Sequence, residues 1–140
     1  MADVSQGAET RPRALSRKVL SKTRLVKSFG FAWAGLSYAW RKEPNFRIEI
    51  FIGMAALGLA LWLGVSPVPI LLCCALVLAL ELINSALEAA IDLVSPELHP
   101  LAKLTKDAAA GAVLLTAIIA TMVGLWTLGP ALWHKLSGLF

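Results

Sequence analysis

Apolar residues gather in three long runs in the second and third thirds of the chain. They cover about residues 46–64, 68–94 and 106–128. A helix rises about 1.5 Å per residue and a bilayer core is about 30 Å thick, so each run is long enough to cross a membrane. "GVSPVP" and "SPELHPLAK" separate the runs and carry turn residues, while Gly129 and Pro130 are expected to end the third. The pattern predicts three transmembrane helices.

A different pattern precedes these runs. Between about residues 15 and 42, basic and apolar positions alternate, which is typical of an amphipathic helix on a membrane surface. The periodicity is imperfect, and a flexible polybasic tail is the alternative. Residues 1–14 are polar and mixed, and we expect them to be disordered. Residues 15–140 are expected to form one domain.

Composition and charge support a membrane protein. The chain is 58% hydrophobic and 16% charged, with a mean hydropathy of +0.73, and a soluble domain is usually less apolar. Ten of its thirteen Lys and Arg residues lie at or before Arg47. Basic residues beside membrane spans stay in the cytoplasm, so the N-terminus is predicted to be cytoplasmic and the C-terminus external. The expected fold is an all-α membrane protein.

The second run is unusual because its last turns are polar. At about 40 Å it exceeds the hydrocarbon core, and it ends in "ELINSALEAAID", residues 81–92. With about 100° per residue, five side chains fall within an arc of roughly 100°. They form what we call the polar stripe: Glu81, Asn84, Ser85, Glu88 and Asp92. Charged groups at membrane depth are costly, so they usually mark function.

Carboxylates on one stripe repel each other and need compensation. A divalent cation such as Mg²⁺, a protonated carboxyl, or pairing with Lys or Arg would each supply it. Glu81 is the deepest and is the better candidate for a base, whereas Glu43 and Glu88 are nearer water and suit a metal. Lys106 could reach the interface or bind phosphate. Asp107 would suit the first turn of the third helix.

Two stretches of the chain resemble motifs of a known family. "ELINSALEAAIDLVSPELHPLAKLTKDAAAGAVLL" resembles the signature of the small bacterial membrane lipid kinases, the diacylglycerol kinase and undecaprenol kinase family. "GLSYAWRKEPNFR" looks like the N-terminal signature of that family, and the resemblance covers about residues 24–124. It implies a homotrimer of three-span subunits in the bacterial inner membrane. Active sites shared between neighbouring subunits would transfer the γ-phosphate of ATP to a lipid hydroxyl.

The resemblance also implies roles for individual residues. Glu81 is expected to be the general base, supported by Asn84, while Glu43 and Glu88 hold Mg²⁺ with the nucleotide. The residues expected at ATP are Arg24, Phe31, Glu43, Glu88, Glu97, Leu98, His99, Lys106 and Asp107. Those expected at the lipid are Arg24, Trp33, Glu81 and Ala110.

The chain departs from the family pattern at two of these positions. Phe31 stands where the diacylglycerol kinases can have tyrosine, and Ala110 stands where some members have serine near the lipid. "SPELHPLAK" and "AAAGAV" look more like the undecaprenol kinase branch. These stretches favour undecaprenol over diacylglycerol as the substrate.

Two other functions are compatible with parts of the pattern. A small non-enzymatic transporter could use the polar stripe as a cation path, although the charges fall on one side of the membrane. A membrane anchor with a nucleic-acid-binding basic arm is the least favoured, because the apolar runs explain the basic residues by orientation. The expected partners are therefore ATP, a lipid alcohol, the membrane and further copies of the chain, with no nucleic acid.

Overall fold

Four helices form the described part of the chain, which is residues 22–95, 97 and 99–138 of a computed structural model. They are α1 (Lys22–Lys42), α2 (Pro44–Leu63), α3 (Val68–Val94) and α4 (Pro100–Ser137). The last three are long and apolar enough to cross a membrane. These findings confirm the predicted all-α fold with three potential spans. The predicted disorder of residues 1–14 and the predicted helical residues before Lys22 lie outside the described residues.

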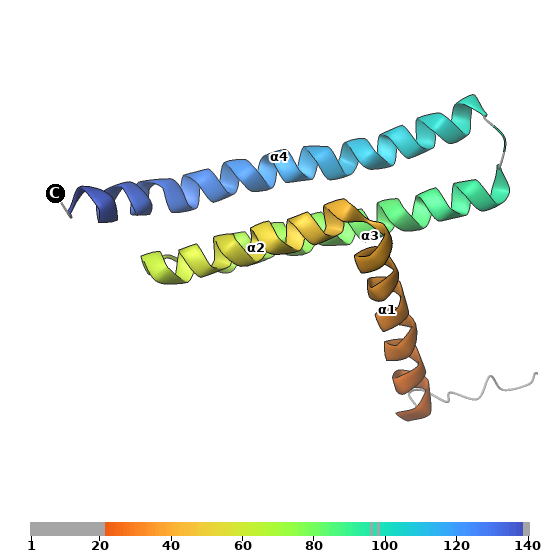
Figure 1. Cartoon of the computed structure of the whole chain (residues 1–140), viewed down its shortest axis with the longest axis horizontal. Helices are drawn as coiled ribbons and strands as arrows, with labels where there is room; N and C mark the ends of the chain where they lie inside the picture. The colour runs from red at the N-terminus through yellow and green to blue at the C-terminus, as the bar shows by residue number, and fades with distance from the viewer. Residues whose placement is uncertain (1–21, 96, 98, 139–140) are drawn as a thin grey trace, which may run out of the picture.

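The three long helices lie side by side, and α1 leaves them steeply (Figure 1). α3 packs against both α2 and α4, whereas α2 and α4 contact each other less. The chain reverses direction between α2 and α3 and again between α3 and α4. As a result, the start of α2, the end of α3 and the start of α4 all face the same end of the bundle.

A proline creates the corner between α1 and α2. Pro44 disfavours helical geometry in the residue before it, and Glu43 is extended, with φ −102° and ψ 106°. The Glu43 amide still donates to the Ala39 carbonyl at 2.9 Å, so the break is confined to one residue. The corner places Glu43 at the start of α2. That α1 is amphipathic and lies on the membrane surface stays a prediction.

The turn between α2 and α3 requires a glycine. Gly64 has a φ of 73°, which residues with a side chain rarely adopt. Its amide donates to the carbonyls of Ala60 and Leu61, and the Val65 amide donates to Ala60 at 3.1 Å. These bonds satisfy carbonyls that the end of α2 would leave unpaired. The predicted reversal at "GVSPVP" is confirmed.

α4 is longer than the third predicted span. It begins at Pro100 and runs through Pro130 to Ser137, so the prediction that Gly129 and Pro130 end the helix is wrong. A proline costs one backbone hydrogen bond, and the rest of a membrane helix can tolerate that loss. The extension brings Lys135 to the end of α2. Its Nζ donates to the Trp62 carbonyl at 2.7 Å and lies 4.1 Å from the centre of the Trp62 ring.

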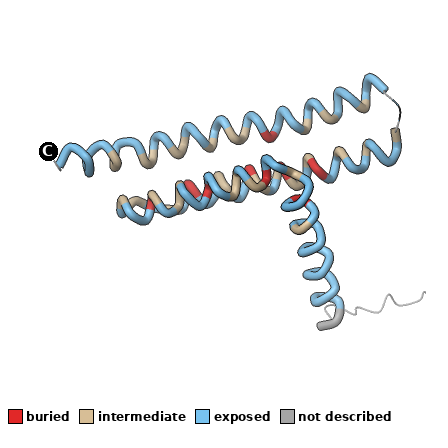
Figure 2. Tube along the Cα trace, viewed as in Figure 1, coloured by how far each residue is buried: buried red, intermediate tan, exposed pale blue. Residues whose placement is uncertain are grey.

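Few side chains are buried within the single chain. In the described residues the buried apolar side chains are Ala39, Phe46, Ala60, Ile70, Val77 and Val113. Most of the other described residues are exposed, as the pale blue of Figure 2 shows. Outward-facing apolar side chains on all three long helices fit a protein covered by lipid or by other chains.

Candidate functional site

The polar stripe lies on the second half of α3 and is buried at its deep end. Glu81 is only 3% exposed and Ser85 only 7%. The Ser85 hydroxyl donates to the Glu81 carbonyl at 3.0 Å, so it leaves the Glu81 carboxylate free. One turn further, Asn84 Nδ2 donates to Glu88 Oε1 at 3.2 Å. The amide therefore orients the side chain of Glu88.

In the part of the chain that the structure describes, basic side chains neutralise only the outer end of the stripe. Among the described residues, the ion pairs join Lys106 to Asp92 and Lys103 to Asp107. Neither Glu81 nor Glu88 takes part in these pairs. Pairing with Lys or Arg, one of the ways to compensate their charge, is not seen in this part of the chain. The negative charges of Glu81 and Glu88 must then be balanced in another way, and a bound cation or a proton would each be suitable.

The start of α4 lies at the same end of the bundle as the end of α3, and a side chain caps it. His99 precedes the helix, and its Nδ1 accepts a hydrogen bond from the Leu101 amide at 3.2 Å. Because α4 begins at Pro100, Asp107 lies beyond its first turn, which contains no acidic residue. The predicted placement of Asp107 at the helix N-terminus is therefore wrong. Asp107 instead pairs with Lys103, one turn earlier.

The Mg²⁺ predicted at this end of the bundle would have to be shared with a nucleotide. The described residues contain no group of three or more His, Cys, Asp or Glu arranged for a metal. Mg²⁺ is commonly held by one or two carboxylates together with substrate phosphates, so Glu43 and Glu88 would be sufficient. In addition, Asn84 Oδ1 is buried and has no hydrogen-bond partner in this part of the chain. Such a group usually has a ligand, a water or another chain as its partner.

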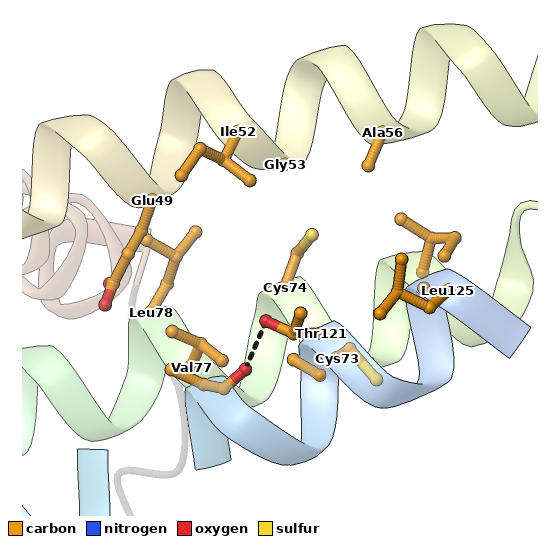
Figure 3. A pocket seen from close by; sticks show the side chains of 14 residues that line it. Glu49, Ile52, Gly53, Ala56, Cys73, Cys74, Val77, Leu78, Thr121 and Leu125 are labelled. Carbon is orange, nitrogen blue, oxygen red and sulfur yellow. Dashed lines mark hydrogen bonds between the residues drawn. The ribbon is translucent and has the colours of Figure 1, made fainter. Parts of the chain in front are cut away.

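Glu49 was not predicted as a site residue, but it lines a cavity of about 310 Å³ between α2, α3 and α4 (Figure 3). The rest of the lining is mostly apolar and includes Gly53, Cys74 and Leu125. Glu49 Oε2 is buried and has no hydrogen-bond partner among the described residues. The signal was present in the sequence, because Glu49 stands inside an apolar run as Glu81 does.

Other predicted site residues are exposed and dispersed. Arg24, Phe31 and Trp33 lie on α1, and Phe31 and Trp33 are 77% and 73% exposed. Trp33 lines a second cavity, of about 460 Å³, at the corner between α1 and α2. Glu97 and Ala110 are also exposed. Leu98 lies outside the described residues.

Comparison with known proteins agrees with these features. The chain matches the family model for prokaryotic diacylglycerol kinase over residues 30–128. It is 47% identical over 112 residues to a diacylglycerol kinase of Synechocystis, covering 77% of this chain and 64% of that protein. It is 37% identical over 103 residues to a diacylglycerol kinase of Escherichia coli, covering 71% of this chain and 84% of the relative.

The chain is also 37% identical over 112 residues to an undecaprenol kinase of Bacillus subtilis, covering 78% of this chain and 91% of that protein. Both names describe lipid kinases, as the sequence motifs predicted. The match over residues 30–128 contains α2, α3 with its polar stripe and most of α4. The chain therefore belongs to the prokaryotic diacylglycerol kinase family of lipid kinases.

Proposed function

We propose that this chain transfers the γ-phosphate of ATP to the hydroxyl of a membrane lipid alcohol. The observation that carries the proposal is Glu81, a carboxylate that is 3% exposed on an apolar helix and has no ion-pair partner among the described residues. A carboxylate at that depth can meet a hydroxyl that stays within the membrane. The remainder of the polar stripe leads from Glu81 toward the end of the bundle where α4 begins.

In the proposed reaction, Glu81 accepts the proton of the lipid hydroxyl. The lipid oxygen forms a bond to the γ-phosphorus as the bond from that phosphorus to the β-phosphate oxygen breaks, and ADP leaves. Glu43 and Glu88 would hold Mg²⁺, which neutralises phosphate charge. Asn84 supports this arrangement by orienting Glu88 through its amide. The function of these side chains is thus positioning and proton transfer.

Further contacts to ATP are proposed for Lys106, Asp107, His99, Glu97 and Leu98. Arg24 and Phe31 on α1 would join them, and Arg24, Trp33 and Ala110 would contact the lipid. α1 projects away from its own bundle (Figure 1), so it is placed to reach a neighbouring copy. We therefore propose a homotrimer with shared sites. The mass of the detergent-solubilised protein, measured by light scattering, tests that assembly.

For the lipid we propose a class, the membrane lipid alcohols. The relatives include both diacylglycerol kinases and an undecaprenol kinase, and the preference for undecaprenol stays a prediction from the sequence. The test is an assay of the purified protein with Mg-ATP that offers diacylglycerol and undecaprenol side by side. Phosphorylation of neither lipid would contradict the proposal.

Glu81→Gln tests the proposed base. It keeps the shape of the side chain but cannot accept the proton, so turnover should fall by about 10²- to 10⁴-fold. Ser85→Ala is the matched control, since Ser85 is also buried on the same helix and, among the described residues, its hydroxyl bonds to the Glu81 backbone. Its rate should stay near that of the wild type. A wild-type rate in Glu81→Gln would eliminate Glu81 as the base.

A further inference from the structure

An ion pair joins α3 to α4 at the end of the bundle where the proposed nucleotide site lies. Lys106 Nζ on α4 donates to Oδ1 of Asp92 on α3. Asp92 is the outermost carboxylate of the polar stripe, and its side chain is 66% exposed, whereas that of Lys106 is 34% exposed. The lysine is therefore the more enclosed partner, and the carboxylate is the one with more freedom to leave.

This pair occupies the ammonium group of Lys106, which the proposed function assigns to ATP. A lysine ammonium is a compact charge with three donors, and it binds a carboxylate or a phosphate by the same kind of charged hydrogen bond. A largely exposed ion pair contributes little stability. The phosphates of ATP carry more charge than one carboxylate, so they can displace Asp92 from Lys106.

We propose that Asp92 competes with the nucleotide for Lys106 and so acts as an autoinhibitory contact. The inference rests on the proposed function, because it needs Lys106 to bind phosphate. Asp92 holds Lys106 while the site is empty and gives it up when ATP binds. The carboxylate therefore weakens ATP binding but takes no part in the transfer of the phosphoryl group.

Removing the charge of Asp92 tests this competition. Asp92→Asn should lower the KM for ATP by about two- to five-fold, as expected for losing an exposed ion pair, and should leave kcat unchanged. Asp92→Glu is the matched control, because it keeps the charge and can still reach Lys106; its KM should equal that of the wild type. An unchanged or higher KM in Asp92→Asn would overturn the inference.

A second measurement separates competition from general repulsion of ATP. In a Lys106→Gln background, equilibrium binding of a fluorescent ATP analogue should be the same with Asp92 as with Asn at that position. If Asp92→Asn still tightened binding there, the carboxylate would act without Lys106 and the inference would be wrong. A wild-type protein without ATP-dependent lipid phosphorylation would instead contradict the proposed function.

Discussion

At the residue scale, Asn84 is bonded to Glu88, the neighbouring carboxylate of the polar stripe. Its amide donates to Glu88 Oε1 at 3.2 Å, while its own Oδ1 is buried without a partner in the described chain. Asn84→Leu keeps the branched shape of the side chain but removes the amide that bonds Glu88, so we expect the Mg²⁺ concentration for half-maximal activity to rise by about two- to ten-fold. A magnesium titration of the purified enzyme measures it. An unchanged titration curve would show that the amide does not position a metal ligand.

The sequence was sufficient to place residues that lie together on one helix. The spacing of Glu81, Asn84 and Glu88 determines their common face once the helix is recognised, and α3 matches its predicted bounds of 68–94. Residues that act across helices were harder to predict. The partnership of Asp92 with Lys106 depends on how α3 and α4 dock. The place of Glu49 in the cavity depends on the packing of three helices.

At the element scale, a close approach of α2 to α3 depends on Gly53. A methyl group added there would lie 2.9 Å from Cys74 Sγ, which is too close for ordinary packing. We expect Gly53→Ala to lower the free energy of unfolding by about 1–2 kcal/mol. Thermal unfolding in one fixed detergent measures the loss.

Gly58 provides the matched control for this substitution. A methyl group there would meet nothing within 4 Å, so Gly58→Ala should be neutral or stabilising by up to about 1 kcal/mol. Adding Cys74→Ala to Gly53→Ala should relieve the overlap and recover part of the loss. Equal stability of the two alanine variants would mean that Gly53 is not a packing requirement.

The ends of the elements were less predictable than their existence. α2 and α3 lie close to their predicted ranges, because glycine and proline mark the turn between them. The same two residue types at Gly129 and Pro130 do not end α4. Lys135 and Trp62 are 73 positions apart in the sequence, and their contact joins the ends of two helices. Local sequence rules cannot predict such a contact.

At the scale of the whole molecule, the proposed orientation in the membrane makes a direct prediction. With three potential spans in the described residues and a basic N-terminus predicted in the cytoplasm, the C-terminus is predicted to lie outside the cytoplasm. Alkaline phosphatase is active only after export, so a fusion after Phe140 should be active. A fusion after Glu97, between α3 and α4, should be inactive. The reverse pair of results would invert the topology and move the polar stripe to the outer face.

The sparse interior described above has a consequence for how stability is defined. Only six apolar side chains are buried among the described residues, and α4 contributes just Val113 to them. Much of the free energy that holds α4 in place must then come from its surroundings, since membrane helices associate through packing with whatever touches them. The surrounding amphiphile, together with any neighbouring copy of the chain, then contributes to the stability of the fold. A melting temperature therefore belongs to the protein and its detergent together, and changing the detergent changes the thermodynamic system.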